Sequence, residues 1–162
     1  SLAEMVAANW CTGVSSPWVE SFKIAEKGGA AGETRLYEVV FSYTDSTQAR
    51  STAKQYVTVE RSEEAWLVSS IETVDAAGLI KEVTPGDNGA TRVYMEDSER
   101  TSPSDRATVV VSASTRILDG ETGAQLTIED LKVGVRVEAT FDGPHIMIYP
   151  VQAGAKTIRA FR

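Results

Sequence analysis

Apolar and polar residues alternate along much of the first half of this chain, which is the period of a β-strand with one buried face. The alternation is clearest at residues 35–44, RLYEVVFSYT, where Tyr37, Val39, Phe41 and Tyr43 share one face. Three further stretches of strand length, separated by hairpin-sized connectors, are residues 18–27, 54–62 and 65–74. Together these stretches predict an antiparallel meander of four strands, each with one apolar face to cover.

A helical period precedes these strands at residues 1–11. Ser1 and Glu4 form a capping-box pattern, in which each side chain satisfies a free backbone N–H of the first turn. The apolar residues that follow recur at helical spacing and are Leu2, Met5, Val6 and Trp10. We therefore expect a short helix packed on the four-stranded sheet, which makes residues 1–77 an α+β domain.

The second half contains shorter strand patterns around one helix-sized piece, residues 127–134. In this piece Thr127 is a candidate helix cap, Asp130 lies three residues on, and Gly134 ends the turn. The strand patterns are residues 78–84, 91–97, 107–114, 135–141 and 154–161. Three strands, a short helix and two strands is the order of a five-stranded OB-type barrel. We therefore place a domain boundary near residue 77 and predict an OB-like β-barrel over residues 78–162.

Charge, cysteine content and motifs exclude several chemistries. The chain has 16 Lys and Arg against 23 Asp and Glu, a net charge of −7, which disfavours binding to nucleic acid phosphates. Cys11 is the only cysteine, so an internal disulfide or a thiolate-rich metal site is excluded. The acidic stretches at residues 85–89 and 96–100 lack calcium-loop spacing, and the glycines of residues 26–33 lack the context of a phosphate cradle. No cofactor and no metal site is predicted.

Residues 143–156, GPHIMIYPVQAGAK, contain the only histidine of the chain. Nucleophilic catalysis of the Ser–His–Asp kind needs a histidine held by a carboxylate, whereas His145 is flanked by Pro144 and Ile146. Pro150 interrupts a hydrogen-bond ladder and suits an edge or a bend. We interpret this stretch as the closure of the barrel. His145 is a candidate pH-sensitive group, because its ordinary pKa lies near 6.5, and no catalytic residue is predicted.

Three stretches of the second half resemble a family of small extracytoplasmic proteins, often lipoproteins, of Gram-positive bacteria. They are GLIKEVT at residues 78–84, TIEDLKVGVRVEATFDGP at residues 127–144, and YPVQAGAKTIRAF at residues 149–161. The last belongs to an ending of the type GPxxxxYPVQAxAKxI. The function of that family is unknown. The resemblance implies a small β-barrel outside the cytoplasmic membrane, and it supplies no catalytic residue.

The first half resembles a small cystatin-like or NTF2-like domain. The residues that carry this likeness are ANWCTGVSSPWVESFKI at 8–24, YEVVFSYTDS at 37–46 and QYVTVERSEEAWLV at 55–68. The resemblance implies a helix followed by a curved sheet. Only one helix pattern is present, whereas large members use several helices to form a deep pocket.

These observations predict a non-catalytic binding or protein-interaction module at the cell envelope, with a protein or peptide partner. Any attachment to the membrane is expected through a removed N-terminal anchor. The expected ligand-binding site is the concave face of the first sheet around Tyr43, Tyr56 and Trp66. The junction between the two domains, at residues 72–79, is the second choice.

Two alternatives from other functional classes stay open. The first is a small-pocket enzyme, a hydrolase or isomerase, that uses Glu38 or Asp45 of the first domain. The second is an oligonucleotide-binding barrel, which requires exposed aromatic and basic side chains along one strand face.

Overall fold

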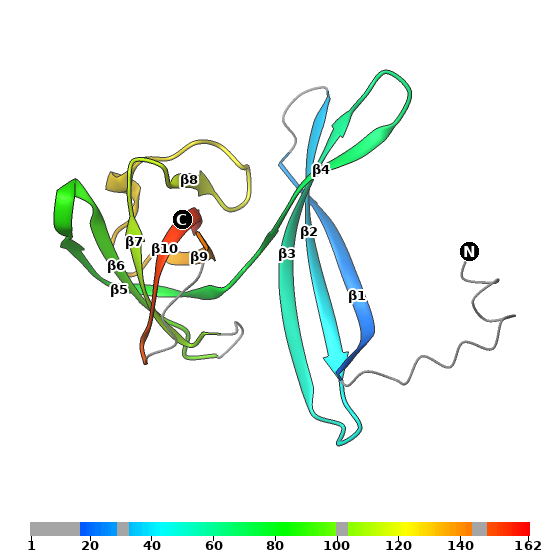
Figure 1. The fold of residues 1–162 in the computed structure, drawn as a ribbon, viewed down its shortest axis with the longest axis horizontal. Helices are drawn as coiled ribbons and strands as arrows, with labels where there is room; N and C mark the ends of the chain where they lie inside the picture. Colours follow the sequence, from blue (N-terminus) through cyan, green and yellow to red (C-terminus); the bar gives the residue numbers. More distant parts are fainter. Residues whose placement is uncertain (1–16, 29–32, 100–103, 144–148) are drawn as a thin grey trace, which may run out of the picture.

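The computed structural model shows an open β-sheet beside a small closed β-barrel (Figure 1). The described residues are 17–28, 33–99, 104–143 and 149–162. The predicted helix at residues 1–11, together with Cys11 and His145, lies outside these residues.

The predicted four-stranded antiparallel sheet is present in the first half. Its strands are β1 (Trp18–Lys27), β2 (Thr34–Thr44), β3 (Arg50–Arg61) and β4 (Trp66–Thr73), and they pair in sequence order. Glu38 of β2 lies opposite Tyr56 of β3, which in turn lies opposite Glu72 of β4. Because directly paired residues share a face of a sheet, these three side chains form one row across it.

The second half forms a small closed barrel of five strands. Its strands are β5 (Ala76–Pro85), β6 (Thr91–Glu96), β7 (Arg106–Val111), β9 (Arg136–Phe141) and β10 (Val151–Phe161). The strand order is β7-β6-β5-β9-β10, and the parallel pairing of β10 with β7 closes the ring. The short strand β8 (Arg116–Asp119) also pairs with β10. Alternate residues of these strands fill the barrel with a single apolar core that includes Ile80, Met95 and Ile158.

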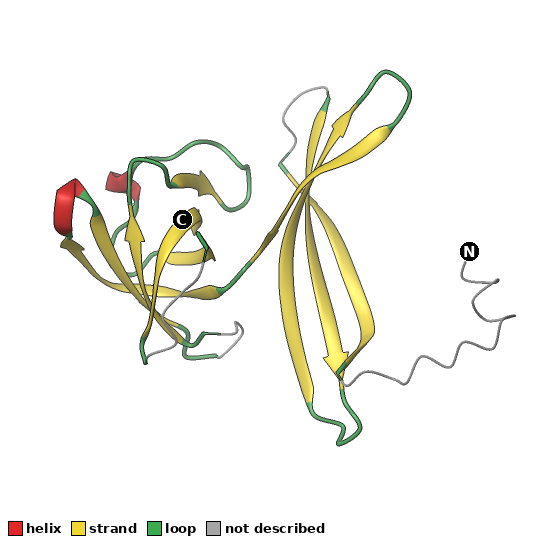
Figure 2. Cartoon of the chain, viewed as in Figure 1, coloured by secondary structure: helices red, strands yellow, loops and turns green. Residues whose placement is uncertain are grey.

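The predicted helical piece at residues 127–134 is a single 3₁₀ turn, Ile128–Asp130 (Figure 2). The expected capping box between Thr127 and Asp130 is present. The turn does not extend into a helix, because Leu131 is buried in the barrel core and the N–H of Gly134 donates to the carbonyl of Ile80 on β5. The backbone after Asp130 is therefore held by the barrel and not by helical hydrogen bonds.

The prediction of an α+β fold with a helix on the sheet is wrong. The described residues contain two single-turn 3₁₀ elements, Asp87–Gly89 and Ile128–Asp130, and no α-helix. Among these residues, no helix is long and apolar enough to cross a membrane. The barrel packs against the face of the sheet that carries Glu38, Tyr56 and Glu72, which is opposite the apolar face on which the helix was expected. Tyr56, Val74 and Ala77 form a second apolar cluster there.

The connection from the sheet to the barrel is hydrogen-bonded on both sides. The N–H of Val74 donates to the carbonyl of Lys54 in the sheet, and the N–H of Asp75 donates to the carbonyl of Ala139 in the barrel. The carboxylate of Asp75 also accepts a hydrogen bond of 2.8 Å from the N–H of Phe141. The two residues that link β4 to β5 are thus attached to both structures.

Candidate functional site

The most concentrated group of charged side chains lies where the sheet meets the barrel. Its centre is the carboxylate of Glu72 on β4, whose side chain is 3% exposed. This carboxylate accepts hydrogen bonds from Nη2 of Arg159 at 2.9 Å, from Oγ1 of Thr157 at 3.2 Å, and from Nη2 of Arg116. The ammonium group of Lys156 lies 3.5 Å away. Three cations therefore surround one buried carboxylate.

The charges around Glu72 keep it ionised. Burial alone raises the pKa of a carboxyl group, because it removes water from the charged form. The hydrogen bond and positive charge of Arg159, together with the charges of Arg116 and Lys156, outweigh this effect. The pKa of Glu72 consequently lies below its ordinary value of 4.5.

A second set of contacts surrounds Tyr56, the most deeply buried aromatic residue of the sheet. Its hydroxyl donates to Oε2 of Glu138 on β9 at 2.8 Å and lies 3.3 Å from Oε2 of Glu38. The ammonium group of Lys54 bridges the same two acids, at 2.8 Å from Glu138 and 3.1 Å from Glu38. The guanidinium carbon of Arg159 lies 3.8 Å from the centroid of the Tyr56 ring. Arg159 thus joins the two sets of contacts.

The register of the strands explains why these side chains meet. On the sheet, Glu38, Tyr56 and Glu72 form the row already described. On the barrel, Glu138 of β9 lies opposite Arg159 of β10. Ile158 is fully buried in the barrel core, so its neighbours Thr157 and Arg159 point outward, toward the sheet. We call the facing rows the junction network, which consists of Glu38, Lys54, Tyr56, Glu72, Arg116, Glu138, Lys156, Thr157 and Arg159.

The junction network is suited to holding charges in fixed positions. Burial, and then the negative charge of Glu138, raise the pKa of the Tyr56 hydroxyl, so it remains protonated and acts as a hydrogen-bond donor. Burial alone lowers the pKa of Lys54. Its contacts with Glu138 and Glu38 have a larger, opposite effect, so the pKa lies above its ordinary value and Lys54 remains charged. A tyrosine that stays protonated and ions that stay paired are suited to a structural role and not to that of a general acid or base.

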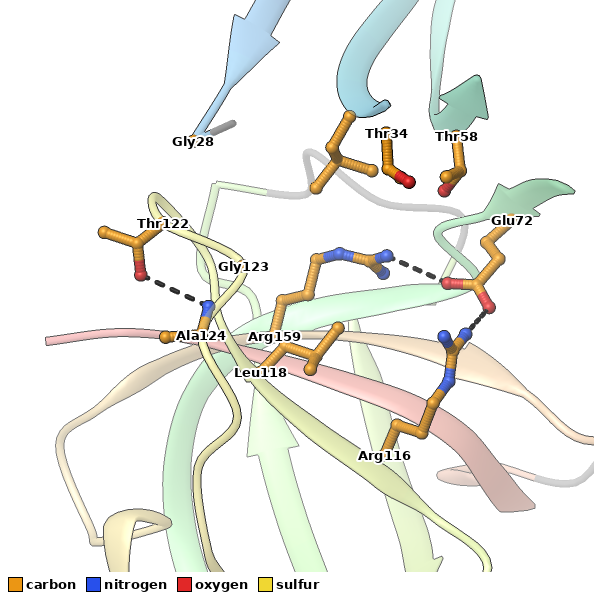
Figure 3. Close-up of a pocket in the computed structure, with 11 residues that line it drawn as sticks. Gly28, Thr34, Thr58, Glu72, Arg116, Leu118, Thr122, Gly123, Ala124 and Arg159 are labelled. Carbon is orange, nitrogen blue, oxygen red and sulfur yellow. Dashed lines mark hydrogen bonds and ion pairs between the residues drawn. The ribbon is translucent and has the colours of Figure 1, made fainter. Parts of the chain in front are cut away.

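A pocket of about 330 Å³ opens beside this network, between the sheet and the barrel (Figure 3). Its charged lining is Glu72, Arg116 and Arg159. The remaining lining consists of threonine hydroxyls and small or apolar residues, which are Gly28, Thr34, Leu36, Thr58, Leu118, Thr122, Gly123 and Ala124. A β-carbon at Gly28 would collide with the backbone of Thr122, so the end of β1 approaches the barrel closely at one side of the pocket.

The opposite face of the sheet, which we call the outer face, is apolar and exposed. It carries Val19, Phe22, Ile24, Trp66, Val68 and Ile71, whose exposed fractions range from 42% to 62%. Cross-strand pairs place them on one side, since Phe22 lies opposite Phe41 and Ile71 lies opposite Val57. Six large apolar side chains in contact with water on one sheet form a surface of the kind that partners cover.

The three residues predicted as a binding site do not come together. Tyr43 and Trp66 lie on the outer face, near opposite ends of the sheet. Tyr43 packs against Phe41, with ring centroids 6.2 Å apart, while the guanidinium of Arg35 lies 4.8 Å from the ring of Trp66. Tyr56 lies on the other face and is buried in the junction network.

The two carboxylates of the enzyme alternative have structural contacts. Glu38 pairs with Lys54 in the junction network. Asp45 accepts hydrogen bonds from the N–H and hydroxyl of Thr47 and from the N–H of Ala49, and so shapes the β2–β3 hairpin. The hydrogen bonds from Thr47 hold the pKa of Asp45 below its ordinary value, which is the opposite of what a general acid requires.

Sequence reasoning missed Arg116, Glu138 and Arg159. A signal was present for two of them, because Glu138 in RVEATF and Arg159 in KTIRAF each lie between apolar neighbours in a strand. A charged residue at such a position ordinarily faces water. Nothing in the local sequence indicates that another sheet covers that side. No group of three or more His, Cys, Asp or Glu residues with metal-site geometry is found in the part of the chain that the structure describes.

In comparisons with known proteins, no family model, no curated protein and no solved structure matches this chain.

Proposed function

We propose that this protein is a non-catalytic interaction module whose outer sheet face binds an apolar surface of a partner protein. The observation that carries the proposal is the group of six exposed apolar side chains on one face of the sheet. Fully burying one large apolar side chain is worth about 1.5–3 kcal/mol. Covering this face with a partner therefore provides a substantial driving force for association.

The arrangement of the outer face favours a polypeptide partner. Phe22 and Trp66 are aromatic anchors of the kind that dominate protein interfaces. At one end of the face Arg35 lies over Trp66, and its Nε is 4.0 Å from Glu26, so a polar rim borders the apolar residues. An apolar centre with a polar rim is the usual anatomy of a protein–protein interface.

The location that we propose is the cell envelope. This part of the proposal rests on the resemblance of residues 78–162 to small extracytoplasmic proteins. We also propose that the barrel is of the OB type, since its closure by the parallel pair β7–β10 and the 3₁₀ turn before β9 agree with the element order of that fold.

Photocrosslinking in the cells that produce the protein tests the proposed interface. A photoreactive amino acid replaces Ile24 on the outer face or, as a control, Val133, which is 65% exposed on the barrel side of the molecule. We expect a crosslinked adduct with one second protein at position 24 and none at position 133. That partner, once purified, should bind the full chain, and the double substitution Phe22→Ser with Ile24→Ser should weaken binding at least tenfold.

Three results would contradict the proposal. Adducts of equal yield at positions 24 and 133 would indicate non-specific contact. Adducts formed only between copies of this chain would identify the outer face as a self-association surface. A purified partner whose affinity is unchanged by the double substitution would place the interface elsewhere.

A further inference from the structure

We propose that the pocket between the sheet and the barrel binds a small molecule through an oxyanion group, a carboxylate or a phosphate, held by Arg116 and Arg159. This site is separate from the outer sheet face, so it stands or falls independently of the proposed protein interaction.

The charge of the pocket favours an anion. Its lining contains two arginines and a single carboxylate, that of Glu72, and Lys156 lies 3.5 Å from the same carboxylate. The lining therefore has a net charge of +1, whereas the whole chain carries a net charge of −7. A local excess of positive charge in a half-enclosed site raises the local concentration of anions.

The arginines retain unused hydrogen-bonding capacity. A guanidinium group has five N–H donors in a planar fork that matches carboxylate and phosphate oxygens. Nε of Arg159 is buried and has no hydrogen-bond partner among the described residues, although a buried donor without a partner is costly. Both hydrogen bonds of Arg116, to Glu72 and to Thr157, come from its Nη2 nitrogen, and its side chain is 52% exposed.

The two arginines are held in place before any ligand binds. Arg159 lies over the ring of Tyr56 and donates to Glu72, and Arg116 donates to the other oxygen of the same carboxylate (Figure 3). Glu72 therefore positions both guanidinium groups, while its single negative charge balances only one of their two positive charges. Fixing the donors in advance reduces the entropy lost on binding.

The rest of the pocket limits the size of the ligand. A volume of about 330 Å³ corresponds to about eleven water molecules at ~30 Å³ each. Thr34, Thr58 and Thr122 supply hydroxyl groups, and Leu36 and Leu118 supply apolar surface. This combination fits an oxyanion attached to a short carbon body.

The test uses the purified full chain and two probes, inorganic phosphate and succinate, with sodium chloride added to keep the ionic strength constant. Isothermal titration calorimetry measures the affinity, and thermal unfolding measures the stabilisation that a ligand of the folded state produces. We expect saturable binding of at least one probe and a rise in Tm that grows with its concentration. Binding of phosphate alone would identify a phosphate-bearing ligand, and binding of succinate alone would identify a carboxylate.

Three variants separate this site from general charge effects. Arg116→Gln should weaken binding at least tenfold. Arg92→Gln should leave it unchanged, although Arg92 is equally exposed and also pairs with a carboxylate, that of Asp87 on the far hairpin. Thr58→Phe keeps every charge and fills the pocket from β3, so it should also abolish binding, and it keeps the proposal testable if Arg116→Gln destabilises the fold.

The proposal is overturned if neither probe binds at constant ionic strength. It is also overturned if Arg92→Gln weakens binding as much as Arg116→Gln does, or if Thr58→Phe leaves the affinity unchanged.

Discussion

The barrel and the four-stranded sheet are both antiparallel β-structures for the most part, yet they bury their side chains in different ways. The barrel closes on itself through β7 and β10 and encloses a core that contains 17 of the described residues. The sheet is open, and Tyr56 is the only residue of β1–β4 in the smaller buried cluster, which it shares with Val74 and Ala77. The barrel therefore supplies its own core, whereas the sheet depends on the junction with the barrel.

The two faces of the sheet extend this contrast. The face toward the barrel buries ions that are paired across the junction, and the outer face exposes apolar side chains. A substitution on the first face should disturb folding, and a substitution on the second should disturb binding.

The largest effect is expected from Arg159→Ala. Removing this guanidinium takes away the one cation beside Glu72 that is itself buried, and it removes the stacking partner of Tyr56. Loss of one partner of a buried ion pair costs about 3–5 kcal/mol. Urea unfolding should show this loss, and Arg162→Ala, an exposed arginine three residues on, should change stability by less than about 1 kcal/mol. Equal effects of the two substitutions would show that the junction does not stabilise the sheet.

A smaller effect is expected from Tyr56→Phe, which removes one hydroxyl and keeps the ring under Arg159. The lost hydrogen bond joins a neutral donor to a charged acceptor, Glu138, and such bonds contribute about 1.5–3 kcal/mol. Tyr43→Phe on the outer face is the matched control, and it should change the free energy of unfolding by no more than about 0.5 kcal/mol. A stability for Tyr56→Phe equal to that of the control would contradict the structural role of Glu138.

Acid should weaken the junction through Glu72. Its pKa in the folded protein is lower than the 4.5 of the unfolded chain, so between these two values the unfolded state binds more protons. The stabilisation is fully present above about pH 5.5 and decreases as the pH falls through 4.5 toward the folded pKa. Chemical unfolding between pH 7 and pH 3 should therefore show a shallower acid loss for Glu72→Gln than for wild type. Glu64→Gln, in the exposed β3–β4 turn, should keep the wild-type slope.

The smallest effect on folding is expected on the outer face. Phe22→Ser should change the free energy of unfolding by about 0.5 kcal/mol or less, because Phe22 is 62% exposed and its removal leaves no cavity. The same substitution should lower the binding of a hydrophobic dye such as ANS to the folded protein. A loss of stability comparable to that of Tyr56→Phe would show that this face is packed in solution.

The sequence predicted the strands of the sheet better than it predicted which structure packs against each face. The alternation of Tyr37, Val39, Phe41 and Tyr43 indicates a strand with one apolar face, and the sheet contains that strand. The same alternation does not reveal which structure covers a face, because a helix and a barrel both suit an apolar or mixed surface. A helix was expected on the apolar face, whereas the barrel packs on the opposite face, beside Tyr56 and Glu72.

The candidate site was harder to predict for a related reason. Glu72 and Arg159 are 87 residues apart in the chain. Their contact depends on the register of two sheets and on how those sheets pack, and neither is written in a local pattern. Tyr56 was predicted to bind a ligand together with Tyr43 and Trp66, but the sequence did not indicate that it lies on the opposite face from them.

The separation between Glu72 and Arg159 also sets an order of events during synthesis. All four strands of the sheet leave the ribosome before β10, which pairs with β7, β8 and β9 and carries Arg159. At about 5–20 residues per second, the 87 residues between the two partners take roughly 4–17 s to synthesise. For that interval the carboxylate of Glu72 lacks Arg159, and the face of the sheet that carries it is not yet covered by the complete barrel. The last barrel strand to be synthesised, β10, thus supplies the arginine that attaches the sheet to the barrel.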